Sequence, residues 1–498
     1  TKLTGNNNVA VGTNAGLVLQ GAANANTFVG VDAGKAVTTG VENILIGMGA
    51  GDTLTDADYN VAIGATALTS DTLGSRSVAI GQEALTAQNF TTATDTYNVA
   101  VGFLAGKAIT TGINNTLIGG LAGDALTDAD LNVAVGRNAL TADTLGSKST
   151  AIGTGALGVQ NFTTATDTLN TAVGYDAGVA VTTGIRNTLI GALAGDALTD
   201  ADNNVAIGQS ALTNDTLGSN SIAIGDNALS SQNFTTATDA FNTAVGHRAG
   251  VALTTGVQNT FVGALTGDGT NDGARNTAIG YFTLSGNCGD DNSAVGENSL
   301  ATTTGSKNTG IGGNSGESNT SGNNNLFLGF EAGVTGSPGG NQTTGTDAIF
   351  LGDENIGDAH IQVDWTVASD QRDKTDFTAL DLGLDFVKAL APVTYKWDKR
   401  SKYGDKRADG YDLNAQTPDG THKEDWLDIG FKAQEVEALE IAAGYNKSSK
   451  TNLVSSHTGD GKQMGLQYSK FVPILVKAMQ EQNALIEALT ARITTLEG

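Results

Sequence analysis

The residues of this chain that are best suited to chemistry lie in one short run, Ser369-Asp370-Gln371-Arg372-Asp373-Lys374. The run places a serine hydroxyl and a lysine amine five residues apart. A serine hydroxyl is a weak nucleophile until a nearby group removes its proton. A lysine amine can remove it when burial lowers the pKa of that amine. An isolated serine and lysine are more often part of a solvated charged turn, so the run alone leaves both interpretations open.

Other reactive side chains are not grouped in this way. The histidines lie far apart and lack the spacing of metal ligands; they are His247, His360, His422 and His457. The single cysteine, Cys288, excludes an intrachain disulfide and suits a buried small residue. Acidic pairs such as Asp56 and Asp58 are able to bind Ca²⁺, but polar turns use the same residues. We predict no metal site and no cofactor, with calcium at the acidic pairs as the alternative.

A repeat fills the first three quarters of the chain. Twenty times, a short and mostly apolar triplet runs into a glycine, usually behind asparagine or serine, as in Asn60-Val61-Ala62-Ile63-Gly64. Most of these glycines are 17 residues apart. A fixed short period is typical of a solenoid, and the triplets have the composition of strands. We predict a mainly β protein with a parallel β-solenoid (β-roll) shaft of about 20 coils over residues 1–352, with two short strands in each coil.

A longer period of 72 residues adds an insertion with the sequence Gln-Asn-Phe-Thr-Thr-Ala-Thr-Asp at residues 88–95, 160–167 and 232–239. Insertions at a fixed phase lie on one face of a solenoid. Phe90, Phe162 and Phe234 are therefore possible receptor contacts, because exposed aromatic rings favour sugar or protein partners. A structural loop that packs on the next coil is the other interpretation.

The solenoid has few large apolar residues per coil, so a single chain would bury little surface. Packing three chains about one axis supplies the missing core, and small alanines and glycines let the chains approach closely. We predict a homotrimer, with a wide single-chain solenoid as the alternative.

Residues 1–359 carry 31 acidic and 10 basic residues, a net charge of −21 out of −25 for the chain. An acidic rod repels nucleic acid and anionic membranes, and no apolar run is long enough to span a bilayer, so we expect neither partner.

The composition changes near residue 353. All three tryptophans lie beyond this point, the repeats stop, and helical patterns appear at residues 379–390 and 431–439. At the end, apolar residues alternate in steps of four and three, which is a heptad seam. The seam residues are Leu475, Met479, Gln482, Ile486, Leu489, Ile493 and Leu496. We predict a trimeric coiled coil at about residues 468–497.

Both parts resemble known families. The repeat motif resembles the left-handed parallel β-roll of trimeric autotransporter adhesin heads, and similar patterns occur in bacteriophage tail-fibre shafts. The run from Ala368 to Lys374 resembles the opening of the endosialidase-type intramolecular chaperone domain of phage tailspikes and fibres. Residues 392–397 (PVTYKW) and 430–436 (GFKAQEV) resemble later blocks of that domain, in the same order, and the final helix resembles its end.

The second resemblance implies a small α+β chaperone domain at residues 369–498, after a neck at residues 353–368. It implies self-cleavage between Ala368 and Ser369, with Ser369 as the nucleophile and Lys374 as its general base. Asp370 matches the motif and takes a positioning role. No other catalytic activity is expected.

Together the resemblances imply a bacteriophage tail fibre that recognises the host. We expect a homotrimer in the virion, assembled in the host cytoplasm, with phage tail or baseplate proteins and a host-surface polysaccharide or protein as partners. Near-identical coils pair out of register at little cost, so a C-terminal trimeriser would set the register. Its removal would then make the product kinetically hard to unfold. A bacterial surface adhesin and a polysaccharide-degrading tailspike are the alternatives.

Overall fold

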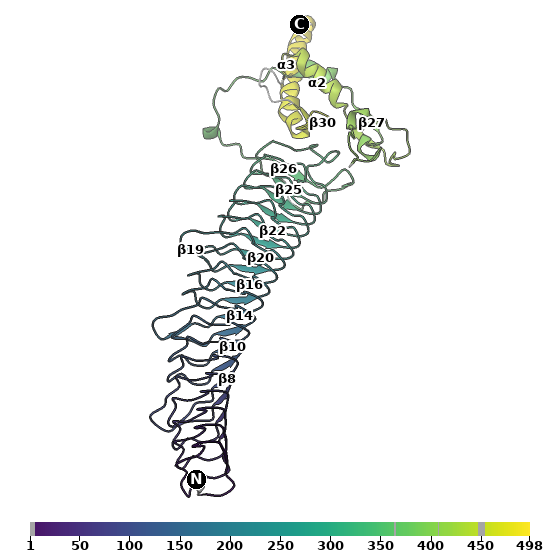
Figure 1. Ribbon diagram of the computed structural model, residues 1–498. Helices are drawn as coiled ribbons and strands as arrows, with labels where there is room; N and C mark the ends of the chain where they lie inside the picture. Colours follow the sequence, from purple (N-terminus) through teal and green to yellow (C-terminus); the bar gives the residue numbers. More distant parts are fainter. Residues whose placement is uncertain (1–4, 363–364, 407, 447–453) are drawn as a thin grey trace. The chain divides into compact units, whose positions relative to one another are not determined.

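A computed structural model describes residues 5–362, 365–406, 408–446 and 454–498. The chain divides into two compact units, Thr1–Asn298 and Ser299–Gly498. The first unit consists of solenoid coils. The second contains the last strands of the solenoid and a mixed region of short helices, short strands and one long helix (Figure 1).

Each of the twenty motifs forms one three-residue strand directly before its glycine, and the strands belong to a 20-stranded sheet. They are β1 (Val9–Val11), β2 (Thr27–Val29), β3 (Ile44–Ile46), β4 (Val61–Ile63), β6 (Val78–Ile80), β8 (Val99–Val101), β9 (Thr116–Ile118), β10 (Val133–Val135), β12 (Thr150–Ile152), β14 (Thr171–Val173), β15 (Thr188–Ile190), β16 (Val205–Ile207), β18 (Ile222–Ile224), β20 (Thr243–Val245), β21 (Thr260–Val262), β22 (Thr277–Ile279), β23 (Ser293–Val295), β24 (Thr309–Ile311), β25 (Leu326–Leu328) and β26 (Ile349–Leu351). Neighbouring strands within a unit pair in parallel, as β3 does with β4. The predicted parallel solenoid is confirmed.

The second strand that we expected in each coil is a turn in most coils, so that prediction is wrong. Among the described residues of the coils, three further pairs of two-residue strands join the last two residues of each insertion to an earlier segment; they are β5 (Gly74–Ser75) with β7 (Thr94–Asp95), β11 (Gly146–Ser147) with β13 (Thr166–Asp167), and β17 (Gly218–Ser219) with β19 (Thr238–Asp239). Elsewhere, residues with a positive φ interrupt the extended backbone after the motif glycine, as Asp32 (φ 59°) does. The coils still bond to one another there, since Asp32 N donates to Thr13 O at 2.8 Å.

The neighbouring coil requires a glycine at the end of each motif. Gly47 has a φ of 137°, which side chains with a Cβ rarely adopt. A Cβ on Gly47 would lie 2.3 Å from the carbonyl oxygen of Gly64, the glycine of the next coil. Stacking of successive coils at strand spacing therefore excludes every other residue at this position.

The motif asparagine forms a ladder along the solenoid. Asn43 N donates to Asn26 Oδ1 at 2.9 Å, and Asn60 N donates to Asn43 Oδ1 at 2.9 Å. The Nδ2 atom of Asn43 donates to the carbonyl of Ala57 at 2.7 Å, across its own coil. All three asparagines are buried, so the ladder satisfies polar groups that would otherwise be costly to bury.

A buried carboxylate anchors each insertion. Asp143 Oδ1 accepts hydrogen bonds from Gly146 N (3.0 Å) and Phe162 N (3.1 Å), while Oδ2 accepts one from Gln160 Nε2 (2.6 Å). Asp71 and Asp215 make the equivalent contacts in the other two insertions. Asp143 is fully buried, and this burial raises the pKa of its carboxyl group. Its stabilising effect comes from the three donors that it satisfies.

We expect Asp143→Ala to lower the free energy of unfolding by about 1–3 kcal/mol, because it leaves three buried N–H donors without an acceptor. Chemical denaturation of the purified protein measures this change. Asp167→Ala is the control, because Asp167 is exposed in the same insertion and its ion pair with Lys148 lies at the surface. Equal stability of the two variants would contradict the anchoring role.

Among its described residues, the mixed region of the second unit contains three α-helices, α1 (Leu384–Ala389), α2 (Ala433–Ala442) and α3 (Phe471–Glu497). Its strands form two antiparallel pairs, β27 (Val393–Tyr395) with β28 (Asp428–Gly430) and β29 (Ser455–His457) with β30 (Met464–Leu466). Four described 3₁₀ turns complete it: η1 (Gln371–Asp373), η2 (Arg400–Lys402), η3 (Leu413–Ala415) and η5 (Tyr468–Lys470). The predicted small α+β region that ends in a long helix is confirmed.

A small apolar core holds the helices of this region together. Its buried residues are Leu382, Phe386, Val436, Val454, Phe471 and Ile474. Glu481 on α3 also accepts a hydrogen bond from Leu384 N at the start of α1, at 2.7 Å, and so satisfies one of the free N–H groups of that helix. No helix in the described ranges combines the length and apolar character needed to cross a bilayer.

Candidate functional site

The structure brings the serine and the lysine of the sequence motif together. Lys374 Nζ lies 2.5 Å from Ser369 Oγ and 3.4 Å from the Ser369 carbonyl oxygen. The single turn η1 lies between them, and Lys374 N closes it by donating to Gln371 O at 3.2 Å. A neutral lysine amine at this distance is within reach of the hydroxyl proton.

Asp370 organises this turn. Its Oδ1 accepts a hydrogen bond from Arg372 N at 2.9 Å, as an N-cap does. The Arg372 guanidinium pairs with the same carboxylate, with Nη2 2.6 Å from Oδ2. Hydrogen bonds from the Arg372 side chain and backbone lower the pKa of Asp370. The carboxylate therefore remains charged and caps the turn, which is compatible with the predicted positioning role.

Ser369 and Lys374 are open to solvent in a single chain. All residues from Trp365 to Thr378 are exposed, and the flanking Trp365 and Val367 expose 72% and 77% of their surface. Burial is one way to favour the neutral amine that a lysine base needs, and Lys374 is exposed in one chain. The close contact between Ser369 and Lys374 is present, but a single chain leaves it open to solvent.

Comparison with known proteins bears on this segment. Residues 369–445 match the family described as the chaperone of endosialidase, Peptidase_S74. The match begins at Ser369, and it confirms the family resemblance for this part of the chain. No curated protein and no solved structure matches the chain. The roles of Ser369, Lys374 and Asp370, and cleavage after Ala368, stay predictions.

A buried carboxylate that the sequence did not single out lies within the matched residues 369–445, called the chaperone segment below together with the residues that follow to 498. Glu440 on α2 is fully buried and accepts hydrogen bonds from Ser455 Oγ (2.5 Å) and Val454 N (2.5 Å) at the start of β29. These bonds tie α2 to β29. The only signal in the sequence was a glutamate on the apolar side of a helical pattern, which gives no indication of its partner.

The phenylalanines of the insertions are buried. Phe90, Phe162 and Phe234 expose only 7%, 6% and 6% of their surface. Each is held inward through its own N–H, as Phe162 N bonds to Asp143. The expectation that these rings are exposed to a receptor is therefore wrong, and the interpretation as a packed structural loop is favoured. The exposed residues of the first insertion are instead Asn89, Thr91, Thr92, Ala93 and Asp95.

Replacement of all three phenylalanines by alanine should lower thermal stability, since each buried Phe→Ala change costs about 3–5 kcal/mol. If the rings make no contact with a receptor, any binding of the shaft to cells should stay unchanged at temperatures where the variant is still folded. Calorimetry and a cell-binding assay measure the two effects. As a control, Thr91→Ala with its equivalents Thr163→Ala and Thr235→Ala should leave the melting temperature unchanged. Loss of cell binding with unchanged stability would restore the receptor role of the rings.

The acidic pairs bond within the solenoid. Asp58 Oδ1 accepts a hydrogen bond from Val41 N at 2.8 Å, and Asp56 accepts one from the Thr39 hydroxyl of the preceding coil. These contacts favour the interpretation as polar turns. Across the described residues, no three histidine, cysteine, aspartate or glutamate side chains gather as ligands for one metal ion. Cys288 is buried as expected, and burial raises the pKa of its thiol to about 11.

Proposed function

We propose that this chain is a bacteriophage tail fibre, a homotrimeric rod in the virion that recognises a polysaccharide or protein on the host surface. The observation that carries the proposal is the order of the parts. A long β-solenoid is followed by a segment that matches the chaperone of endosialidase and opens with a serine–lysine contact. Phage tail or baseplate proteins would hold the rod.

Exposed apolar surface supports trimer formation. The seam residues of α3 named from the sequence are exposed in a single chain. The central residue is buried in every solenoid strand except β1, and the outer strand residues form two rows along the sheet. The row of third residues is apolar and includes the exposed Ile118, Ile152, Ile279 and Ile311, while Ile44 and Ile222 are exposed in the row of first residues. Contiguous exposed apolar surface of this kind marks an interaction site. Copies of the same chain would cover both surfaces.

Self-cleavage is the second part of the proposal. Lys374 takes the hydroxyl proton of Ser369, and Oγ attacks the carbonyl carbon of Ala368. The C–N bond breaks as an ester forms, the proton passes to the new α-amine of Ser369, and water then hydrolyses the ester. Because the dyad is exposed in one chain, cleavage should follow assembly of the trimer and need no added protease.

Binding of labelled shaft to candidate host cells tests the recognition role. Saturable binding to one bacterial strain and no binding to strains that lack the same surface polysaccharide or protein is the expected result. Equal binding to all strains would contradict host recognition. Loss of polysaccharide viscosity on incubation with the protein would favour the depolymerase class instead.

The α3 seam offers a direct test of trimer formation. Ile486→Asn together with Ile493→Asn places polar groups in the expected coiled-coil core, so trimers measured by light scattering should fall at least tenfold in yield. Thr490→Asn, on the same helix but outside the seam, is the control and should assemble normally. Normal trimers from the double variant would exclude the seam as the trimeriser.

A further inference from the structure

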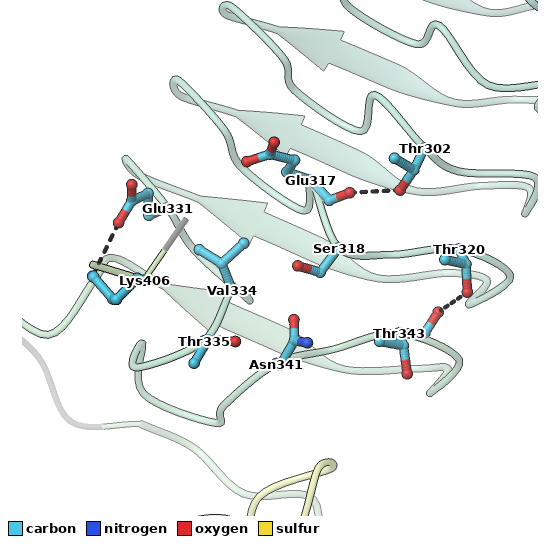
Figure 2. A pocket seen from close by; sticks show the side chains of 10 residues that line it. All are labelled: Thr302, Glu317, Ser318, Thr320, Glu331, Val334, Thr335, Asn341, Thr343 and Lys406. Carbon is cyan, nitrogen blue, oxygen red and sulfur yellow. Dashed lines mark hydrogen bonds and ion pairs between the residues drawn. The ribbon is translucent and has the colours of Figure 1, made fainter. Parts of the chain in front are cut away.

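A polar pocket of about 530 Å³ lies on the last coils of the second unit. Figure 2 shows its walls, which are rich in hydroxyl groups from residues such as Thr302, Ser318 and Thr320. Glu317, Glu331 and Asn341 contribute carboxylate and amide groups, and Lys406 reaches in from the chaperone segment. The volume lies in the range of small-molecule sites, and the lining suits a ligand that carries many hydroxyl groups.

The Lys406 ammonium group occupies one end of this pocket. Its Nζ lies 3.2 Å from Glu331 Oε2 and also contacts Glu354 Oε1. The Glu354 side chain is only 6% exposed, and its second oxygen, Oε2, has no hydrogen-bond partner. Burial lowers the pKa of Lys406, but the two carboxylates outweigh it and raise the pKa above its ordinary value. A buried carboxylate in this setting requires a cation.

The cation and the carboxylates lie on opposite sides of the expected cleavage point. Glu331 and Glu354 precede Ala368 and stay with the shaft, whereas Lys406 belongs to the segment that leaves. Lys399, which donates to the Glu354 carbonyl at 2.7 Å, leaves with it. Release of residues 369–498 therefore withdraws the ammonium group and leaves a vacant position between two carboxylates.

We propose that the pocket binds an amino sugar, and that Lys406 occupies its ammonium subsite until the chaperone segment leaves. The ammonium group of the sugar takes the position of Lys406 Nζ between Glu331 and Glu354, and the sugar hydroxyls bond to the threonine and serine hydroxyls of the walls. Opening of the site in the native protein rests on the proposed self-cleavage. Neutral and anionic glycans would bring no cation to Glu331 and the buried Glu354 and would bind weakly.

The test uses the full chain with Ser369→Ala, so that nothing is released. Calorimetry measures binding of a glucosamine hexamer and of its fully N-acetylated form, which lacks the charge. Ser369→Ala with Lys406→Met should bind the glucosamine hexamer at least about tenfold more tightly than Ser369→Ala alone, because charged hydrogen bonds become available to the ligand. Adding Glu331→Gln should remove the gain.

Two control variants isolate the subsite. Lys406→Arg keeps the cation and should give no gain, and Lys402→Met removes a charge from η2 without altering the lining of the pocket. Circular dichroism melting checks that every variant is folded. The proposal is overturned if Lys406→Met gives no gain in affinity for the glucosamine hexamer, or if the acetylated hexamer binds as tightly as the glucosamine hexamer. It is also overturned if a lysine hexapeptide binds as tightly as the glucosamine hexamer. Failure of wild-type self-cleavage would leave these comparisons intact, so the two proposals fail separately.

Discussion

Ser369→Ala should remain at its full length of 498 residues, whereas the unaltered chain should separate into fragments of 368 and 130 residues. The variant lacks the oxygen that attacks Ala368, and no other hydroxyl group of η1 can replace it, because the turn contains only Gln371, Arg372 and Asp373. Denaturing electrophoresis and intact mass spectrometry measure the outcome. The expected effect is complete loss of the two fragments.

Lys374→Ala should give the same result, because it removes the group that lies 2.5 Å from the serine hydroxyl. Thr366→Ala and Lys388→Ala are the matched controls; both residues are exposed and lie outside the contact, and both variants should be cleaved normally. Both uncleaved variants should still form trimers. An unaltered chain that stays intact after long incubation at neutral pH would exclude the peptidase role and leave the folding role standing.

The solenoid could be predicted because a single steric requirement makes one glycine recur in each coil. A side chain at Gly47 would collide with the backbone of the next coil, so the same glycine has to recur wherever a coil stacks. The asparagine that precedes the strand recurs for a similar reason, since Asn43 bonds to both its own coil and its neighbour. Such requirements repeat in the sequence with the period of the structure, and the period is visible without coordinates.

The burial of the insertion phenylalanines could not be predicted in the same way. Phe162 turns inward because its N–H meets Asp143, a residue 19 positions earlier whose side chain faces it only after the coils have stacked. The contact of Ser369 with Lys374 is local, so the motif already indicated it. The solvent exposure of this contact would change if other copies of the chain covered it. The sequence of the segment does not indicate whether they do.

Residues 1–368, produced without the last 130 residues, should fail to assemble into native trimers. The outer strand residues repeat with little variation from coil to coil, so three chains displaced by one coil or by 72 residues bury nearly the same apolar surface. Slipped assemblies then compete with the native register as kinetic traps, and the seam of α3 is the element that distinguishes between them.

We expect the yield of native trimers from the truncated chain to fall at least tenfold, with the remainder as aggregates, in size-exclusion chromatography with light scattering. The matched control is full-length Ser369→Ala, which keeps the chaperone segment attached and should trimerise. The second comparison is the shaft obtained by cleavage of an assembled trimer. It has the same covalent structure as the truncated chain, yet it should remain trimeric, because unfolding from the correct register is slow once the coils have stacked. Equal assembly of the truncated chain would show that the coils find their register unaided, and the folding role of residues 369–498 would be excluded.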